Sequence, residues 1–242
     1  MSGPAVIGVV GGTGFYRLLE DKEEVEVETP YGPPSAPVHV GFVGDRRVAF
    51  LARHGAHHEL PAHRIEHRAN LWALRSLGVR RILAPFAAGS LQPNVHPGDL
   101  VVCDQLVDRT WGRAPTFYDG PEAHHAPFAE PYCAELRLVM SGAALRLGMA
   151  VHDTGTVVVV QGPRFSTRAE SRWFREQGWQ VVNPAARAGG VARPRSSRQR
   201  AAGPRAPPAQ RPGAALPGPH AGDAPSGAAG PRDGGPQVRV AA

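Results

Sequence analysis

Residues 154–171 read TGTVVVVQGPRFSTRAES, and this stretch gives the clearest indication of the fold. Four successive valines predict an apolar strand, and a Gly-Pro pair ends it. Ser166 or Thr167 then stands where a helix N-cap is expected, before a helix that begins near Arg168. A buried strand followed at once by a helix is typical of α/β proteins, whose ligand sites lie at the carboxyl ends of strands. Phe165 is therefore a candidate for packing against a planar base or a sugar.

The same alternation of strands and helices extends back to the start of the chain, which predicts an α/β protein with a largely parallel or mixed sheet. Glycines at 78, 148 and 178 follow the three helical patterns as natural stops. The predicted strands span residues 5–10, 38–43, 48–51, 81–86, 154–161 and 180–182, with one more over 100–107 and an exposed one within 18–32. The predicted helices span 62–77, 134–147 and 168–177.

Residues 184–242 break this pattern. They contain 16 Ala, 11 Pro, 10 Gly and 9 Arg and no aromatic residue. Such a segment cannot bury enough apolar surface to offset its ordering entropy, so we predict a disordered tail. Its 9 Arg and 2 Asp give this segment a net charge of +7, whereas the net charge of the whole chain is +6, so the residues before it carry a net charge of about −1. The basic character belongs to the tail, and we expect no nucleic-acid partner.

The cysteine pattern and the apolar runs exclude other classes of protein. Cys103 and Cys133 have no CxxC spacing, which argues against a disulfide scaffold or a zinc ribbon. The chain shows no basic region followed by a long apolar run, and no apolar stretch of 18 residues. We therefore expect a soluble, cytoplasmic protein with no membrane partner.

A glycine-rich turn, GGTG at residues 11–14, directly follows the first predicted strand. Its backbone N–H groups can approach an anion, and the Thr13 hydroxyl adds a donor. An NADP-binding Rossmann enzyme would need a long helix straight afterwards and a selector residue about 20 positions on. The chain instead runs into the charged segment 18–32. An NADP-binding Rossmann enzyme and a purely structural turn are therefore the two alternatives to an anion-binding turn.

The stretch LARHGAHHEL, residues 51–60, places Arg53 and His54 just beyond a strand end. An arginine can grip phosphate with two N–H groups, and a neighbouring histidine can donate a hydrogen bond or share a proton. The alternatives are a solvated loop or a metal site, although carboxylates are scarce nearby. The histidines of such a metal site would be His54, His57, His58, His63 and His67.

Nine motifs in series resemble the methylthioadenosine phosphorylase branch of the purine nucleoside phosphorylases. In order they are GVVGGTGFY, TPYGPPSAP, FLARHGAHH, HRANLWALRSLGVRRI, AAGSL, GDLVVCDQLVDRT, TFYDG, FAEPYC and VVVVQGPRFSTRAES, covering about residues 6–183. The resemblance implies one α/β domain, residues 1–183, around a mixed, partly barrel-like sheet flanked by helices. It also implies phosphorolysis of a purine nucleoside: phosphate attacks C1′ and a purine leaves. The expected substrate is S-methyl-5′-thioadenosine, giving adenine and 5-methylthioribose 1-phosphate; a 6-oxopurine nucleoside phosphorylase is the alternative.

The resemblance also assigns site residues by their position in the motifs. Thr13, Arg53 and His54 would hold phosphate. The backbone at Phe86 and Ala87 would line the phosphate and ribose site, although Phe86 stands where the family often has Thr and so lacks its hydroxyl. The nucleoside would be bound by two further residues, Phe165 and Ser166.

The resemblance implies a homotrimer that needs phosphate as co-substrate and no metal or organic cofactor. In such an assembly His58 and the loop 116–128 would approach a neighbouring active site.

The resemblance ends at Asn183. The family continues with Met-Thr, a Pro-Glu helix and a strand that delivers an Asp to protonate the purine, whereas Pro184 and Ala185 follow here. The later acids, Asp223 and Asp233, lie in Gly/Pro/Ala sequence without a strand pattern. We therefore identify no catalytic acid and expect poor activity. We also expect that a frameshift, or an error in the gene's sequence, replaced the C-terminal part; a natural disordered tail is the alternative. A non-enzymatic phosphate- or nucleotide-binding protein with a basic tail is a further alternative.

Overall fold

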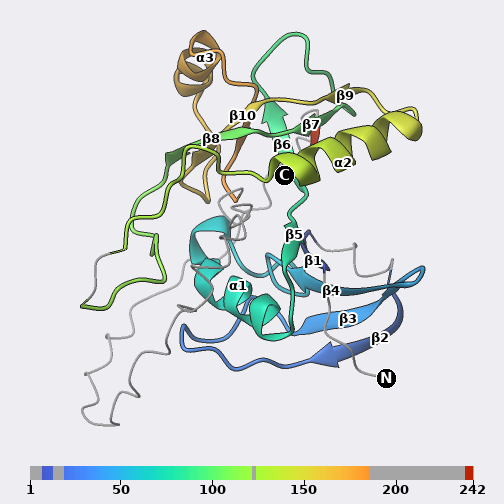
Figure 1. Ribbon diagram of the computed structural model, residues 1–242. Coiled ribbons are helices and arrows are strands. Elements are labelled where there is room, and N and C mark those ends of the chain that lie inside the picture. Colours follow the sequence, from blue (N-terminus) through green and yellow to red (C-terminus); the bar gives the residue numbers. More distant parts are fainter. Residues whose placement is uncertain (1–6, 13–18, 122–123, 186–237, 242) are drawn as a thin grey trace, which may run out of the picture.

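The computed structural model describes residues 7–12, 19–121, 124–185 and 238–241. These residues form two mixed sheets, one above the other in Figure 1, with helices packed against them. The predicted α/β class is confirmed.

The elements follow one another in the order that the sequence predicted, with several additions. The first sheet contains β1 (Ile7–Gly11), β2 (Glu20–Val25), β3 (Val38–Val43), β4 (Arg46–Ala52) and β5 (Arg81–Leu83). The second contains β6 (Phe86–Ser90), β7 (Leu100–Val102), β8 (Gln105–Arg109), β9 (Val151–His152), β10 (Thr156–Val160), β11 (Val181–Asn183) and β12 (Val238–Ala241). The helical segments are η2 (Ala62–Arg64), α1 (His67–Ser76), α2 (Ala134–Arg146) and α3 (Arg168–Glu176).

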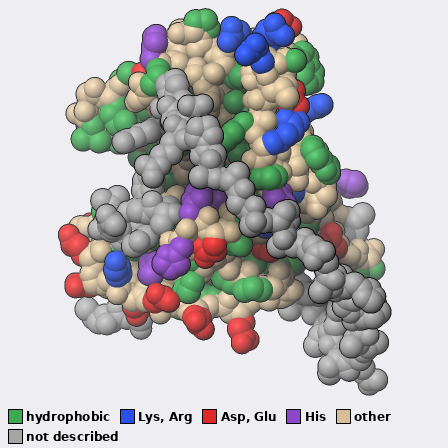
Figure 2. Space-filling model, turned by 180° about the vertical axis from the view of Figure 1, so that it is seen from behind, with side chains coloured by type: hydrophobic (Ala, Val, Ile, Leu, Met, Phe, Trp, Pro, Cys, Tyr) green, Lys and Arg blue, Asp and Glu red, His purple; other side chains and the backbone are tan. Residues whose placement is uncertain are grey.

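The first sheet has the order β2-β3-β4-β1-β5. β1 runs parallel to β4 and β5, whereas β3 is antiparallel to β2 and β4. Both faces are covered: Leu51 packs with Leu74 of α1 on one side, and Phe50 lies in a cluster on the other. β2 is an exposed, acidic edge strand, and its charges protect that edge against pairing with another chain. In Figure 2 acidic side chains gather over this lower part of the molecule.

The second sheet has the order β8-β10-β11-β6-β12-β7-β9. β10 holds the four valines of the opening stretch, where an apolar strand was predicted, and these valines are buried. Val157 and Val159 lie in one core cluster, and Val158 and Val160 lie in another with Phe174 of α3. The period of two along the strand sends alternate valines to opposite faces.

This second sheet is strongly curved. Val102 ends β7 and Gln105 begins β8, yet the two strands lie five positions apart in the strand order. Five positions in a flat sheet would span about 24 Å, whereas three Cα steps span at most about 11 Å. The sheet therefore curls so that β7 and β8 come close together. At this point the N–H of Asp104, between β7 and β8, donates to the carbonyl of Gly155, between β9 and β10, at 3.1 Å. The partly barrel-like sheet implied by the resemblance is therefore present.

Three predicted elements are divided in the structure. The helix predicted over 62–77 breaks into η2 and α1, because Ile65 is extended and buried beside Ala185. The strand predicted over 81–86 stops at Leu83, and Phe86 begins a strand of the other sheet. The run over 100–107 bends at Asp104 and becomes β7 and β8. In each case tertiary packing overrides a continuous local pattern.

The tail contributes one strand that the sequence pattern did not predict. Residues 238–241 form β12, between β6 and β7. The prediction of disorder is therefore wrong for these four residues, because both of their edges are paired within the sheet. The predicted disorder of residues 186–237 lies outside the described part of the chain.

The described residues also bear on membrane insertion and on cysteine chemistry. None of the helices in this part of the chain combines the length and apolarity needed to cross a membrane. Both cysteines are free thiols, and burial raises the pKa of Cys103 to about 12, so that thiol stays protonated at neutral pH.

Candidate functional site

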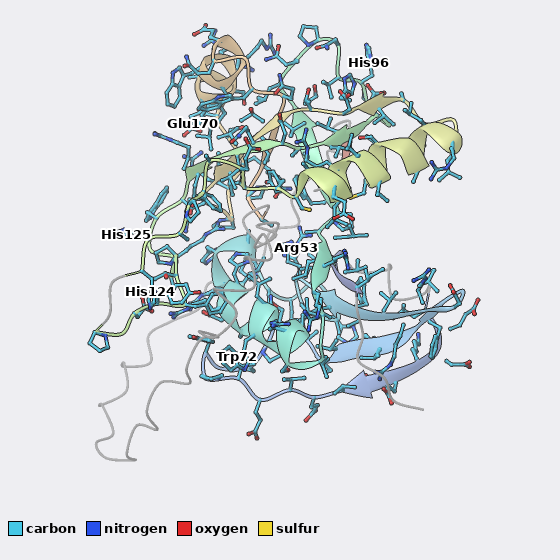
Figure 3. The ribbon with its side chains drawn as sticks, in the orientation of Figure 1. Arg53, Trp72, His96, His124, His125 and Glu170 are labelled. Carbon is cyan, nitrogen blue, oxygen red and sulfur yellow. The ribbon has the colours of Figure 1, made fainter. Side chains whose placement is uncertain are left out.

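The candidate site is centred on Arg53, which follows the end of β4 and is only 2% exposed. Its Nη2 donates to the carbonyls of Val10 and Pro85, each at 2.8 Å. Its backbone N–H donates to the carbonyl of Gly11 at 2.9 Å. Val10 and Gly11 end β1 and Pro85 precedes β6, so one guanidinium joins the two sheets. Figure 3 shows Arg53 between them.

The charge of Arg53 is not fully compensated by the described residues. Its Nε is buried and has no hydrogen-bond partner among them. Burial lowers the pKa of Arg53 to about 10, so the side chain remains protonated at neutral pH. Because a buried cation is costly unless it is paired, this arrangement favours an anionic ligand. The guanidinium carbon also lies 6.0 Å from the ring centroid of Phe86.

His54 has a fixed orientation and a fixed tautomer. Its Nδ1 lies 2.8 Å from the Leu60 carbonyl, which can only accept, so Nδ1 holds the proton and Nε2 keeps its lone pair in the neutral ring. The ring stacks on His58 with centroids 4.6 Å apart. Burial is the main cause that lowers the pKa of His54; the bond to Leu60 opposes it, and the charges of Arg53 and His58 add to it.

A glycine closes the loop that holds His54. Gly55 has a φ of +84°, and a Cβ there would overlap the Glu59 carboxylate. The same carboxylate accepts the His57 N–H at 2.8 Å. No group of three or more His, Cys, Asp or Glu side chains in the described residues is arranged to hold a metal. The burial of Arg53 also makes the solvated-loop interpretation wrong for that residue.

On the other side of Arg53, β6 and β11 are joined by Asn183. Its Nδ2 donates to the carbonyl of Ala87, and its Oδ1 accepts the N–H of Ala185 at 2.6 Å. Asn183 is 7% exposed, so this buried amide fixes both the start of β6 and the chain after β11. This role of Asn183 was not predicted from the sequence, where the residue only marks the end of the resemblance; a polar residue that ends an apolar strand was the available signal.

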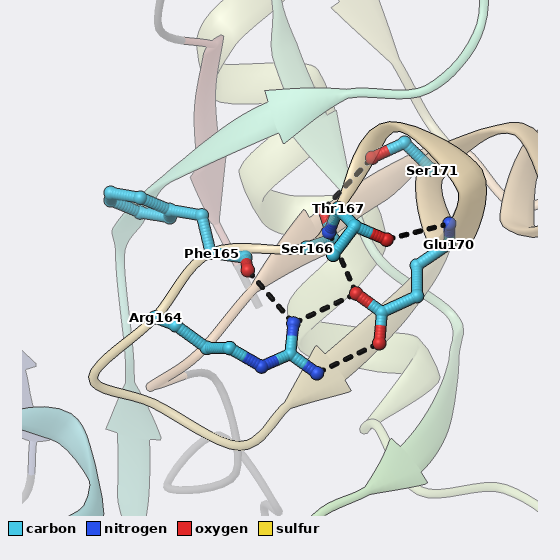
Figure 4. Close-up of polar contacts among 6 residues, drawn as sticks. All are labelled: Arg164, Phe165, Ser166, Thr167, Glu170 and Ser171. Carbon is cyan, nitrogen blue, oxygen red and sulfur yellow. Dashed lines mark hydrogen bonds and ion pairs between the residues drawn. The ribbon is translucent and has the colours of Figure 1, made fainter.

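The corner between β10 and α3 is ordered by its own local bonds (Figure 4). Thr167 is the N-cap and forms a capping box with Glu170, which confirms one of the two predicted caps. Glu170 also accepts two bonds from Arg164, both at 2.8 Å, while the Ser166 hydroxyl lies 2.9 Å from that of Ser171. These bonds fix the backbone that presents Phe165.

The elements that hold Arg53 and this corner come together in one place. A Cβ on Gly162, at the end of β10, would lie 2.9 Å from the Cβ of Ala62 and 3.4 Å from that of Pro184. Ala62 belongs to η2, which follows the His54 loop, and it clusters with Ile65 and Ala185. The absence of a side chain at 162 thus permits three segments to meet.

The predicted site residues fall into three groups. Thr13 lies outside the described residues. Arg53, His54, Phe86 and Ala87 gather where the two sheets meet. In the described structure the side chains of Phe165 and Ser166 make no hydrogen bond to Arg53 or His54, and Phe165 is 79% exposed.

The loop after β8 packs against the first sheet and α1. Arg68 donates to Asp119 at 2.6 Å, and its guanidinium lies 4.8 Å from the ring centroid of Tyr31. Tyr31 in turn contacts Trp72 and Phe117 edge-on. Further along this loop, His124 and His125 are exposed at the side of the molecule away from α2 (Figure 3).

The described site is thus a buried arginine of an α/β protein that lies beside Gly11, at the carboxyl ends of the parallel strands β1 and β4. Residues 6–183 match the model of the phosphorylase superfamily, and the chain belongs to that superfamily. The resemblance to methylthioadenosine and purine nucleoside phosphorylases is thereby confirmed.

Individual relatives agree with this assignment. An S-methyl-5′-thioadenosine phosphorylase of Mycolicibacterium smegmatis is 59% identical over 179 residues, which are 74% of this chain and 67% of that protein. A purine nucleoside phosphorylase of Streptomyces coelicolor is 54% identical over 74% of this chain and 66% of its own length. The solved methylthioadenosine phosphorylase of Schistosoma mansoni matches with a TM-score of 0.71 at 38% identity, covering 76% of this chain and 75% of its own. The chain thus spans about two thirds of the length of these curated relatives.

Proposed function

We propose that this protein binds phosphate and a purine nucleoside, and that it cleaves S-methyl-5′-thioadenosine by phosphorolysis at a low rate. The observation that carries the proposal is the buried guanidinium of Arg53, whose Nη2 is held by two carbonyls and whose Nε has no partner among the described residues. The names of the relatives support the choice of nucleoside.

Arg53 would act by holding phosphate in a fixed position. Both N–H groups of its Nη2 are used on Val10 and Pro85, so the side chain cannot swing away. Its Nε–H, which no described residue accepts, is left for an anion, to which charge-assisted hydrogen bonds are stronger than bonds between neutral groups. The glycine-rich turn that begins with Gly11 and Gly12 would add backbone N–H groups, and Thr13 a hydroxyl.

His54 would select the protonation state of that phosphate. With Nδ1–H engaged by Leu60, the neutral ring offers a lone pair at Nε2. That lone pair can accept the O–H of a singly or doubly protonated phosphate, while Arg53 bonds its anionic oxygens. The nucleophile would thus be oriented by one cation and one neutral acceptor.

Phosphate held in this way would attack C1′ of the nucleoside as the purine leaves through an oxocarbenium-like transition state. Ala87 and Phe86 would line the ribose side, and Phe165 and Ser166 would contact the nucleoside. The acid that protonates the purine is missing from the matched residues. A general acid contributes about 10²- to 10⁴-fold, so we expect turnover slower than that of a full-length relative by roughly this factor.

The direct test is adenine release from S-methyl-5′-thioadenosine with and without phosphate, followed by chromatography. The Mycolicibacterium smegmatis relative serves as the reference enzyme. Slow, phosphate-dependent release supports the proposal, and a rate equal to the reference would contradict the loss of the acid. Activity unchanged by a chelator would support the proposal that the reaction needs no metal ion.

The Arg53→Met variant tests the phosphate site separately from turnover. We expect phosphate binding, measured by calorimetry, to weaken by roughly 10- to 100-fold, because a charged hydrogen-bond donor is lost. Arg46→Met is the control, since Arg46 begins the strand that Arg53 follows and is exposed. If Arg53→Met does not fold, Arg53→Lys keeps the charge and gives the same comparison. Unchanged affinity in both would exclude Arg53 as the phosphate ligand.

A 6-oxopurine nucleoside phosphorylase is the second candidate, favoured by the name of the Streptomyces coelicolor relative. Paired assays with inosine and S-methyl-5′-thioadenosine separate the two. We further propose a cytoplasmic homotrimer in which His58 and the loop 116–128 approach the neighbouring site. Light scattering at several protein concentrations tests the trimer, and a monomer at all of them would contradict it.

A further inference from the structure

The second sheet depends on a strand that comes from far along the chain. β6 pairs with β11 through Gly89 and Ser90, and with β12 over Phe86–Ala88. β7 pairs with β12 on one edge and β9 on the other. Among the described strands, β12 alone bridges β6 and β7. Without it the sheet would separate into the pieces β8-β10-β11-β6 and β7-β9.

The space that β12 occupies has the width of one strand. Strands that flank a common neighbour lie two ladder spacings apart, about 9.5 Å, which leaves room for one extended chain. Both walls belong to a single core cluster, in which Phe86 and Ala88 of β6 join Val101 of β7. An empty space would expose these apolar walls and two unpaired strand edges, which is unfavourable on both counts.

The local sequence of residues 237–242 suits this position. These six residues contain neither Pro nor Gly, although both are abundant in the tail, and they include two of its three valines. β-branched residues favour extended backbone, and the absence of Pro leaves every N–H able to join a ladder. Val240 is opposite Phe86 on one side and Val101 on the other.

We propose that the gap between β6 and β7 is an acceptor site for an extended peptide strand, and that residues 238–241 fill it as a donor strand. The pairing is antiparallel to β6 and parallel to β7. Residues 238–241 read Val-Arg-Val-Ala and contain no acid. They therefore complete the sheet without supplying a base-protonating carboxylate, so the fold and the catalytic rate are separable properties of this chain.

The test uses Val240→Pro in the full chain, with Val240→Ala as the matched control. Proline removes one ladder N–H from a strand that is paired on both edges, whereas alanine keeps it. Hydrogen exchange of peptides covering residues 86–88 and 100–102 is the measurement, without substrate or phosphate. We expect exchange at least about 10-fold faster in the proline variant and near-native exchange in the alanine variant.

A rescue experiment distinguishes local opening from general unfolding. The free peptide PQVRVAA, residues 236–242, is added to the Val240→Pro protein. Recovery of protection at 86–88 supports an acceptor site. Equal exchange in the unmodified chain, Val240→Pro and Val240→Ala would overturn the proposal. Unprotected amides at 238–241 in the unmodified chain would also overturn it. This second measurement can be made even if the proline variant does not fold. Neither result depends on phosphorolysis.

Discussion

The two sheets of this protein are assembled from the sequence in different ways. All strands of the first sheet lie between Ile7 and Leu83, and β3 and β4 are joined by a short turn. The second sheet needs β12, which residues 184–237 separate from β11. Closing a long segment costs entropy that grows slowly with its length, and β12 has only four residues with which to offset that cost. The comparison indicates that the second sheet is the less stable of the two.

The largest expected effect compares two buried phenylalanines. Phe50, inside the first sheet, is 1% exposed, and Phe174, which holds α3 on the second, is 2% exposed. Each substitution by alanine should lower the free energy of unfolding by about 3–5 kcal/mol. We expect Phe50→Ala at the upper end, because strands on both sides prevent collapse around the cavity. Phe174 lies beside Trp173 and Trp179, which can move inward.

Denaturant unfolding monitored by circular dichroism measures both values. A loss for Phe174→Ala that equals or exceeds the loss for Phe50→Ala would contradict the view that the second sheet yields more easily.

A smaller effect concerns the helix cap on the second sheet. Thr167→Ala removes the side-chain acceptor for the Glu170 N–H and should cost about 1 kcal/mol. Ser166→Ala is the control, because its hydroxyl bonds only to that of Ser171 among the described residues. Thermal unfolding of both variants is the measurement. Equal losses would show that the corner is stabilised by the hydroxyl pair as much as by the capping box.

The smallest effect is a pH dependence in the same corner. The bidentate bond from Arg164 holds the pKa of Glu170 at about 2, below its ordinary 4.5. A lowered carboxyl pKa stabilises the folded state above pH 4.5, and this contribution is lost as the pH falls from about 4.5 to 2. Because the pair is partly exposed, we expect under about 1 kcal/mol. The difference in unfolding free energy between the unmodified protein and Glu170→Gln should shrink over this range; a constant difference would contradict the assignment.

Local patterns predicted much of the fold. The four valines of β10, the cap before α3 and the glycines after the helices act over a few residues, so they are readable from the sequence. Gly78, Gly148 and Gly178 have positive φ values, as stops of this kind require. The resemblance also implied that Arg53 and the glycine-rich turn share a phosphate site, and the Arg53 N–H does bond to the carbonyl of Gly11.

Other features required the assembled chain. The break at Ile65, the bend at Asp104 and the buried amide of Asn183 depend on residues more than 50 positions away. The same is true of Arg53, whose partner Pro85 lies 32 residues further along.

The sequence by itself determined the family and the order of the elements, because both rest on short motifs, and through the resemblance it predicted the residues that would hold phosphate. Only the tertiary structure decided that Val238–Ala241 form a strand, and that Arg53 is buried with an Nε that bonds to none of the described residues. Strand pairing and burial are properties of contacts between distant segments. The sequence of these four residues does not by itself predict a strand. They form one because β6 and β7 each offer an edge with which they can pair.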